Sequence, residues 1–355
     1  MKKIFLILIL IPFISLSQVI NKSLYYDGLN REYIIYVPAN YDGSINVPLF
    51  FSFHGGSGYA SDHMQMTNIN TISDTAGFIA VYPQGALDIN GAEPGNTPST
   101  SWLHKAPTTH NDVNFISTII DTLSNEYTID LDRIYACGYS EGGIFSYELA
   151  CRLSNKIAAI GSVSGSMLTE SFRTDYGFGN CSPAHPTAII LIPGTNDGSY
   201  HSLYSGFQPY YLSANEITNY WTSVNNTDLN PISSNVNNTN TNDGSTVEKY
   251  EWKNGDNCVS ITELKVVGGG HDWPGSFGNM DINASVEIWK FVSRFNINGM
   301  INCNTNQLQE NIFTKKKEII KTFDQLGRFV KKEQENHLYF YIYNDGSVEK
   351  RINLK

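Results

Sequence analysis

A serine flanked by glycines at the junction of a strand and a helix is the feature that most limits how this chain can fold. Ser140 lies in the run Gly138-Tyr139-Ser140-Glu141-Gly142-Gly143, directly after the short apolar stretch 134–137. A helical pattern of apolar residues follows the run from Ile144 onward. Small residues on both sides of the serine allow a strand to turn sharply into a helix without side chains striking the neighbouring backbone. The pattern therefore predicts a strained strand–turn–helix unit that presents the Ser140 hydroxyl at its apex.

Around this unit, short apolar runs alternate with amphipathic helical patterns. The strand-like runs are 47–53, 78–82, 134–137 and 187–193. Helices are predicted after Asp112, after a capping box at Ser213 and Glu216, and over a last apolar face formed by Ile288, Phe291, Val292 and Phe295. This alternation predicts an α/β fold, with a mostly parallel sheet covered by helices on both faces. The Asn- and Ser-rich stretch 225–246 is expected to be a long loop.

Two further residues complete a candidate catalytic set with Ser140. In a sheet of this type the ends of parallel strands meet at one edge, and the expected chain order is serine, acid, histidine. Asp197 follows the strand 187–193, and His271 follows the run Val266-Val267-Gly268-Gly269-Gly270. We expect His271 to act as base and Asp197 to orient it. His201, which lies in an aromatic loop, is the alternative base.

An acyl-transfer site also needs donors for the oxyanion. One candidate is the backbone N–H of Glu141, and the other is the N–H of Gly55 or Gly56 in the glycine-rich loop after strand 47–53. We expect His54 to be a structural hydrogen-bonding group. Trp102 and Trp273 flank the expected site and are candidate substrate-binding residues, with packing as the alternative role.

Taken together, these segments resemble a known family. The matching stretches, in order, are His54-Gly55-Gly56, Tyr82-Pro83-Gln84-Gly85, Ser101-Trp102, Asp112-Val113-Asn114-Phe115, Asp132-Arg133-Ile134-Tyr135, the Ser140 turn, Gly194-Thr195-Asn196-Asp197 and Gly268–Gly275. The region from about Tyr25 to Phe295 resembles the secreted polyhydroxybutyrate depolymerase and feruloyl esterase family of α/β-hydrolases.

The resemblance implies a serine ester hydrolase that works through an acyl-enzyme on a polyester or an esterified polysaccharide, without a cofactor or a metal. The alternatives on the same fold are a serine peptidase, an acyltransferase, or a cell-surface binding module that has lost catalysis. Glu141 is an unusual neighbour for the nucleophile, and its charge would disfavour anionic substrates.

The five cysteines cannot all pair with one another within one chain. The resemblance implies a disulfide between Cys151 and Cys181, whereas Cys258 lacks its usual family partner. Cys137 is expected to be a buried thiol in a strand. Cys303 falls in the expected linker. Because the number is odd, at least one thiol stays free or pairs between chains.

The N-terminal end predicts export. Lys2 and Lys3 precede the mostly apolar run 4–14, and Ser15 and Ser17 supply small residues for cleavage, so we interpret residues 1–17 as a signal peptide. The alternative is a buried N-terminal helix. No other apolar stretch is long enough for a membrane span. The net charge of −10 argues against a nucleic-acid partner.

The C-terminal end differs in charge. Residues 313–355 contain ten Lys or Arg and six Asp or Glu, and Asn344-Asp345-Gly346 between alternating strands indicates a hairpin. This tail resembles the sorting domain of type IX secretion cargo through Asp324–Arg328, Tyr341–Tyr343 and Asp345–Val348. A small β domain that binds substrate is the alternative. We therefore expect a hydrolase domain at 18–297, a linker at 298–312, and an all-β tail that interacts with the type IX machinery and places the protein outside the cell.

Overall fold

The computed structural model describes residues 17–88, 99–102, 111–175, 177–303, 319–325, 328–330, 337–343 and 348–353. The chain divides into two compact units, residues 1–303 and 304–355. Almost all of the predicted signal peptide, as well as the hairpin turn Asn344-Asp345-Gly346, lies outside the described residues.

The first unit is built on a ten-stranded sheet, in the order β1-β2-β4-β3-β7-β8-β9-β12-β11-β10. The strands of this sheet are β1 (Gln18–Tyr26), β2 (Leu29–Val37), β3 (Val47–Phe53), β4 (Ile79–Pro83), β7 (Ile129–Tyr139), β8 (Ala159–Val163), β9 (Ala188–Ile192), β10 (Ile232–Asn235), β11 (Thr246–Trp252) and β12 (Ile261–Val267). The helices of this unit are α1 (Ala60–Thr67), α2 (Ile69–Ala76), α3 (Asp112–Glu126), α4 (Glu141–Arg152), α5 (Glu170–Asp175), α6 (Ala214–Asn225), α7 (Ala284–Val292) and the 3₁₀ turn η1 (Asp256–Cys258). The short pairs β5 (Ala86–Asp88) with β6 (Ser99–Ser101), and β13 (Phe295–Asn296) with β14 (Gly299–Met300), lie outside the large sheet.

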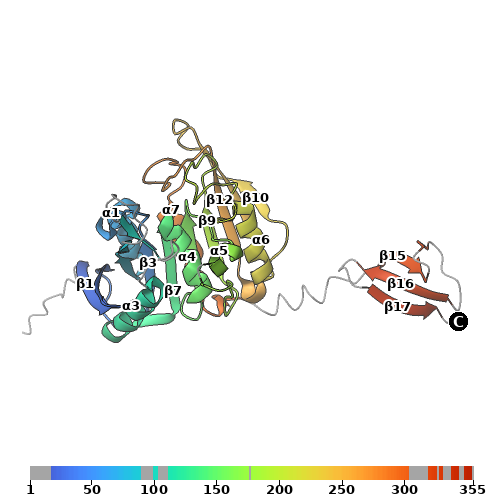
Figure 1. The fold of residues 1–355 in the computed structure, drawn as a ribbon, viewed down its shortest axis with the longest axis horizontal. Coiled ribbons are helices and arrows are strands. Elements are labelled where there is room, and N and C mark those ends of the chain that lie inside the picture. The colour runs from blue at the N-terminus through green and yellow to red at the C-terminus, as the bar shows by residue number, and fades with distance from the viewer. Residues whose placement is uncertain are drawn as a thin grey trace, which may run out of the picture. The chain divides into compact units, whose positions relative to one another are not determined.

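The centre of the sheet is parallel. β4, β3, β7, β8, β9 and β12 pair in parallel, and antiparallel strands complete both edges. The loops that follow β9, β10 and β12 leave the sheet at the same end, which brings distant parts of the sequence together there (Figure 1). The α/β expectation is confirmed, and this loop-bearing end is where the candidate site forms.

Side chains alternate between two apolar cores because successive residues of a strand face opposite sides. On β3, Phe51 packs into a core shared with α3, α4 and α6, whereas Phe50 packs into a core shared with α1, α2 and α7. Both phenylalanines are fully buried. The predicted runs are therefore continuous apolar strands rather than alternating ones because both faces of the sheet are covered.

The edges of the sheet differ from the sequence-based expectation. Residues 18–37 form the β1–β2 hairpin, which was not predicted, and the expected loop 225–246 contains β10, paired with β11. All four residues of β10 are exposed, so the strand carries no apolar signal that could reveal it. Phe295 also proves to lie in β13, after the last helix has ended at Val292.

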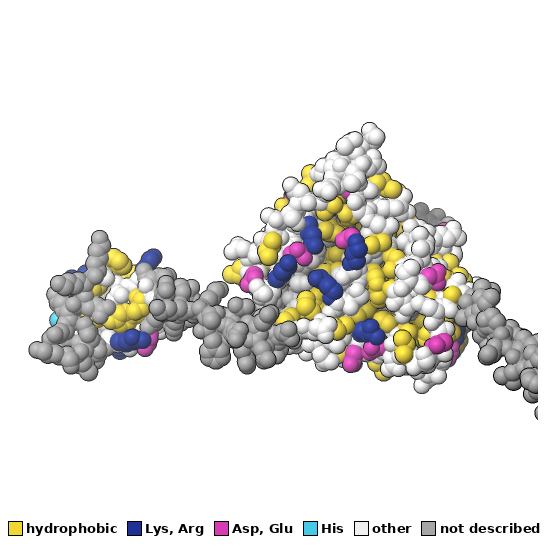
Figure 2. Space-filling model, turned by 180° about the vertical axis from the view of Figure 1, so that it is seen from behind, with side chains coloured by type: hydrophobic (Ala, Val, Ile, Leu, Met, Phe, Trp, Pro, Cys, Tyr) yellow, Lys and Arg dark blue, Asp and Glu magenta, His cyan; other side chains and the backbone are white. Residues whose placement is uncertain are grey.

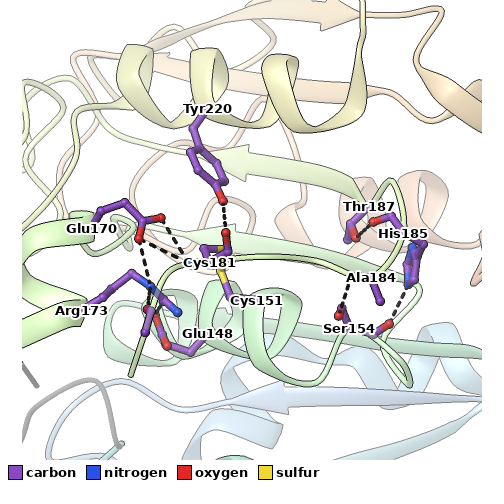
Figure 3. Close-up of a disulfide and its surroundings, with 11 residues drawn as sticks. Glu148, Cys151, Ser154, Glu170, Arg173, Cys181, Ala184, His185, Thr187 and Tyr220 are labelled. Carbon is purple, nitrogen blue, oxygen red and sulfur yellow. Dashed lines mark hydrogen bonds and ion pairs between the residues drawn. A yellow bond between two sulfur atoms is a disulfide. The ribbon is translucent and has the colours of Figure 1, made fainter. Parts of the chain in front are cut away.

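A disulfide attaches the helix that follows Ser140 to its surroundings. Cys151, in the last turn of α4, is bonded to Cys181, as the family resemblance implied (Figure 3). The Cys181 N–H donates to the Glu170 carboxylate at 3.2 Å, and its carbonyl accepts from the Tyr220 hydroxyl at 2.9 Å. The disulfide therefore connects α4 with α5 and α6.

The C-terminal end of the first unit corrects the expectations for Cys258 and Cys303. The two cysteines form a disulfide, so Cys258 does have a partner and residues 298–303 belong to the first unit rather than to a linker. Cys137 is the free cysteine and is fully buried, as expected.

The second unit is a three-stranded antiparallel sheet of β15 (Ile319–Asp324), β16 (His337–Tyr343) and β17 (Val348–Asn353). β16 and β17 pair across the predicted hairpin, from Ile342 opposite Val348 outward. The side chain of Arg328 donates to the Asp324 carboxylate at 2.8 Å. The prediction of an all-β tail is confirmed.

Among the described residues, no helix is both long enough and apolar enough to cross a membrane. Basic and acidic side chains lie close together on the face of the first unit shown in Figure 2. Lys249, Glu251, Glu287, Lys290 and Arg294 line one shallow groove of this unit, with both charge signs represented.

Candidate active site

Ser140 occupies the predicted sharp turn between β7 and α4. Its backbone has φ 55° and ψ −120°, a conformation that L-residues rarely adopt. Gly142 permits the turn because a Cβ at this position would lie 2.3 Å from the Phe53 carbonyl oxygen on β3. The strain places the Ser140 hydroxyl at the loop-bearing end of the sheet, at the N-terminus of α4.

His271 and Asp197 meet Ser140 in a linear arrangement. His271 Nε2 lies 2.9 Å from Ser140 Oγ, and His271 Nδ1 lies 2.7 Å from Asp197 Oδ2. These distances fit hydrogen bonds along the whole series. The structure thus brings together the three residues that the sequence selected.

The two loops that carry the acid and the histidine are joined by hydrogen bonds. The Asn196 N–H donates to the Gly269 carbonyl at 2.8 Å, and the Gly268 N–H donates to the Thr195 hydroxyl at 2.8 Å. Gly194 permits this contact, since a Cβ there would lie 2.3 Å from the Gly270 carbonyl oxygen. The Asp197–His271 distance is therefore set by the loops and not by the two side chains alone.

The Asp197 carboxylate is buried but remains ionised. Burial alone would raise its pKa, but hydrogen bonds from the His271 ring and the Ser199 N–H outweigh this effect and hold the pKa below its ordinary value. An ionised carboxylate accepts the Nδ1–H of His271, which leaves Nε2 with a lone pair for the Ser140 proton.

His271 has two further supports that the sequence did not reveal. The Tyr139 hydroxyl donates to the His271 carbonyl oxygen at 2.7 Å, and Ser202 Oγ lies 3.1 Å from His271 Nδ1. Asp272, its neighbour in sequence, instead accepts the Gly270 N–H at 2.8 Å and shapes the turn. Tyr139 and Ser202 are ordinary residues in the sequence, and only the folded chain brings them to the imidazole.

The alternative base, His201, also reaches the serine. Its Nε2 lies 3.1 Å from Ser140 Oγ. However, the imidazole that contacts Asp197 Oδ2 is that of His271. The geometry therefore assigns the oriented imidazole to His271 and leaves His201 as a second imidazole at the same oxygen.

The glycine-rich loop after β3 packs directly on the nucleophile. A Cβ on Gly55 would lie 3.2 Å from Ser140 Cβ, and a Cβ on Gly56 would lie 2.2 Å from Glu141 Oε1. The Glu141 side chain is buried, and its carboxylate accepts a hydrogen bond from Ser101 Oγ at 3.4 Å. The backbone N–H groups of Glu141, Gly55 and Gly56 thus come from two segments that touch beside Ser140.

His54 fixes the backbone of this loop. Its Nδ1 is 2.7 Å from the Gly55 carbonyl oxygen, so Nδ1 carries the proton, and its Nε2 accepts from the Gly85 N–H at 2.9 Å. Burial lowers the pKa of His54 to about 4, although the Gly55 hydrogen bond opposes the shift. The neutral ring holds the Gly55 carbonyl, and hence the Gly55–Gly56 peptide plane, in one orientation.

The structure corrects the expected substrate-binding role of Trp102 and Trp273. Their side chains are 0% and 1% exposed, so neither ring offers a surface to a ligand. The Trp102 ring stacks on Phe145, and its N–H donates to the His54 carbonyl at 2.8 Å. The Trp273 N–H donates to Ser285 Oγ at 3.2 Å. Both tryptophans therefore belong to the apolar core, where their large rings pack beneath the loops of the site.

Exposed aromatic side chains lie instead in the loop that carries His201. Tyr200, Phe207 and Tyr210 are 50%, 40% and 41% exposed. The Tyr200 ring contacts both the His201 ring, at 4.9 Å between centroids, and the Phe207 ring, at 5.7 Å. These three rings form an exposed aromatic surface connected through His201 to Ser140. The sequence pointed to this aromatic segment but not to its exposure.

Comparison with known proteins agrees with this geometry. Residues 31–180 match the family described as esterase PHB depolymerase. The chain is 30% identical over 288 residues to a bifunctional acetylxylan esterase/xylanase of Neocallimastix patriciarum, covering 79% of this chain and 35% of that protein. It is 26% identical over 278 residues to feruloyl esterase B of Piromyces equi, covering 75% of this chain and 46% of that protein.

Among solved structures, an acetyl xylan esterase from Aspergillus awamori has the same fold, with a TM-score of 0.51 and 16% identity, covering 77% of this chain and 98% of that one. The chain spans only about a third to a half of the length of the two curated relatives. With the Ser140 turn, the acid and histidine that follow it, and the glycine-rich loop in place, residues 31–180 form a domain of the esterase PHB depolymerase family, and the unit that contains them has an α/β-hydrolase fold.

Proposed function

We propose that this chain is a secreted serine esterase that cleaves esters of a polymer through an acyl-enzyme. The observation that carries the proposal is the continuous series of contacts from Asp197 Oδ2 to His271 and from His271 Nε2 to Ser140 Oγ, at 2.7 and 2.9 Å. A serine hydroxyl is a weak nucleophile until a neighbouring base takes its proton, and this series supplies an oriented base.

In the proposed mechanism, Ser140 Oγ attacks the ester carbonyl carbon while His271 Nε2 takes the hydroxyl proton. The N–H groups of Glu141 and of Gly55 or Gly56 stabilise the oxyanion. Collapse of the intermediate expels the alcohol, which receives the proton from His271. Water then attacks the acyl-enzyme with His271 as base again, and the acid leaves.

The exposed rings of Tyr200, Phe207 and Tyr210 favour a substrate with flat apolar faces, such as a polysaccharide or an aromatic acyl group. The names of the relatives, acetylxylan esterase and feruloyl esterase, point in the same direction. Esterified plant polysaccharide is therefore the first candidate, and an aliphatic polyester is the second.

The first experiment measures ferulate release from methyl ferulate by the purified protein, with p-nitrophenyl acetate as a test of general activity. The matched variant Ser140→Ala should lower kcat on both esters by about 10⁴-fold or more. Near-normal activity of this variant would exclude the mechanism. Serine-dependent cleavage of the simple ester without ferulate release would direct attention to acetyl groups and polyesters.

A binding protein without catalysis is separated by labelling with a fluorophosphonate, which reacts only with an activated serine. We expect labelling of the native protein and none of Ser140→Ala or of heat-denatured protein. Absence of labelling in the native protein would favour the binding role. A serine peptidase would label as well, and is excluded if peptides that carry a scissile amide are not cleaved while esters are.

We also propose that the tail directs export through the type IX machinery, after removal of residues 1–17. Two disulfides are consistent with an oxidising compartment outside the cytoplasm. Deletion of 313–355 should retain the protein in the periplasm of a host with that machinery, whereas the full chain reaches the surface or the medium. Equal release of both forms would contradict the sorting role.

A further inference from the structure

Two imidazoles meet the same nucleophile oxygen. His271 Nε2 lies 2.9 Å and His201 Nε2 lies 3.1 Å from Ser140 Oγ, and the two rings are nearly perpendicular, at 84° with centroids 5.8 Å apart. The mechanism described above uses only His271. The contact between His201 and Ser140 therefore needs a separate explanation.

The protons can be assigned from the partners. Asp197 is ionised and accepts the Nδ1–H of His271, so His271 Nε2 is an acceptor. The single proton of the Ser140 hydroxyl goes to that nitrogen. A hydrogen bond between Ser140 and His201 is then possible in one sense only, with His201 Nε2–H as donor and a lone pair of Oγ as acceptor.

The position of His201 is set by its backbone. Its carbonyl oxygen accepts from the Ser166 N–H at 3.1 Å, and the turn that leads to it begins with the Ser199 N–H donating to Asp197 Oδ1 at 2.9 Å. The same short segment thus carries the catalytic acid and the second imidazole. A side-chain substitution at position 201 leaves both of these backbone contacts available.

We propose that His201 is a second catalytic histidine, whose Nε2–H stabilises Ser140 Oγ as the leaving oxygen when the acyl-enzyme is hydrolysed. The inference rests on the serine mechanism proposed above. In that step water attacks the acyl carbon and gives a proton to His271 Nε2. The C–Oγ bond then breaks, its electron pair goes to Oγ, and Oγ takes the proton from His271 Nε2. His201 keeps its own proton throughout and contributes only a hydrogen bond.

The donor acts mainly in this step because the Oγ electron pair is least stabilised while the C–Oγ bond breaks and reprotonation is incomplete. A preorganised donor is most effective where charge develops in the transition state. During acylation the same hydrogen bond is already present to the free Ser140 hydroxyl, so its loss affects the starting state and the transition state together. In the acyl-enzyme the ester oxygen is a weak acceptor, and the bond strengthens only as the C–Oγ bond breaks. The expected signature is therefore a slow deacylation with an almost unchanged acylation.

The experiment measures pre-steady-state and steady-state hydrolysis of p-nitrophenyl acetate by the full chain. We expect His201→Leu to lower kcat by about 10- to 100-fold, as loss of one strong hydrogen bond does. KM should fall by a similar factor, so that kcat/KM, which reports acylation, changes by less than about threefold. A burst of one p-nitrophenol per active site should appear, because the acyl-enzyme accumulates.

Two amide variants provide matched controls. The side-chain amide of His201→Gln can reach the place of Nε2–H, so this variant should recover most of kcat and suppress the burst. His201→Asn carries the same amide on a side chain one methylene shorter, and should resemble His201→Leu. If His201→Leu does not unfold cooperatively, the comparison of Gln with Asn alone decides the question.

Unchanged kcat and KM in both His201→Leu and His201→Asn would overturn the inference. A fall in kcat/KM as large as the fall in kcat, without a burst, would also overturn it, because it would place His201 in acylation. Ser140→Ala is measured in parallel. Retained activity in that variant removes the serine mechanism itself, whereas an inactive Ser140→Ala beside a normal His201→Leu removes only the role of His201.

Discussion

Gly56 lies against the Glu141 carboxylate, so closely that a methyl group on Gly56 would be 2.2 Å from Glu141 Oε1. The two residues come from the two segments proposed to supply the oxyanion donors. A side chain at position 56 would have to displace either the buried Glu141 carboxylate or the loop itself, so the relative placement of the loop and the start of α4 can be tested by substitution.

We expect Gly56→Ala to lower kcat/KM by about 100-fold, because a loop displaced by the new methyl group carries its N–H donor away from the oxyanion, and loss of one such donor has this effect. Adding Glu141→Ala should restore part of the loss, because it removes the group that the new methyl meets. Kinetics of both single variants and the double variant measure this coupling. Gly198→Ala is the control, since a Cβ there has no atom within 4 Å. Additive effects in the double variant would contradict the contact.

The buried His54 predicts a loss of stability in acid. Its pKa is about 4 in the folded chain and about 6.5 in an unfolded one, so the unfolded state binds more protons as the pH falls from about 6.5 towards 4. This histidine alone should lower the free energy of unfolding by up to about 3 kcal/mol across that window. His63, which is buried with a lowered pKa, acts in the same direction.

Urea unfolding of the wild type and of His54→Asn at pH 7 and pH 4.5 isolates the contribution of His54. The variant can still donate to the Gly55 carbonyl but has no ring to titrate. Its stability at pH 7 should be lower than that of the wild type, and its decrease between the two pH values should be smaller. An equal decrease in both proteins would mean that His54 is not neutral when folded.

The cysteines predict a definite thiol count. Four of the five are in disulfides, and burial raises the pKa of the Cys137 thiol to about 12. Ellman's reagent should therefore react with no thiol in the native protein and with one per chain in denaturant without reductant. Three reactive thiols in denaturant would show that one of the two disulfides is absent, and Cys258→Ser or Cys151→Ser would identify which one.

Glu148 in α4 and Arg173 in α5 form an ion pair, and both side chains are almost completely buried (Figure 3). Burial raises the pKa of Glu148, against the opposing effect of Arg173 and Arg152. Removing one partner leaves the other buried charge without its main counter-ion, so Glu148→Gln or Arg173→Met should each destabilise the fold by about 3–5 kcal/mol.

The double variant Glu148→Gln, Arg173→Met should lose less stability than the sum of the two single variants, since neither charge of this pair is then left without the other. Urea unfolding of all three variants tests this relation. A single variant with wild-type stability would mean that water reaches the pair. The surface pair Lys290–Glu287, with the lysine side chain 66% exposed, is the control, and its loss should cost at most about 1 kcal/mol.

The parts of this fold that the sequence revealed are those with a strong local cause. The runs that became β3 and β9 are apolar except for Ser52 because both faces of the central sheet are covered. The Ser140 turn could be recognised because close backbone contacts require glycine at Gly138 and Gly142, two positions before and after the serine. Asp197 and His271 could be selected because parallel strands end at one edge, which fixes where their loops must lie.

Other parts depend on long-range contacts that leave no local pattern. The Trp102 ring is buried because it packs against Phe53 and Phe145, which come from separate elements. The partner of Cys258 lies 45 residues away and becomes a neighbour only when the chain end folds back beside η1. Similarly, His201 was an alternative to His271 in sequence, and only the structure shows that both imidazoles reach one oxygen.

The disulfide between Cys258 and Cys303 also makes the end of the first unit a convenient junction for protein engineering. Cys303 is the last residue of that unit, so a cut or a fusion after it leaves the final turn covalently closed. Replacing everything beyond residue 303 by a display anchor, an affinity tag or a carbohydrate-binding module should therefore keep the catalytic unit's stability. The tail proposed to direct export and the unit proposed to carry the chemistry can in this way be exchanged independently.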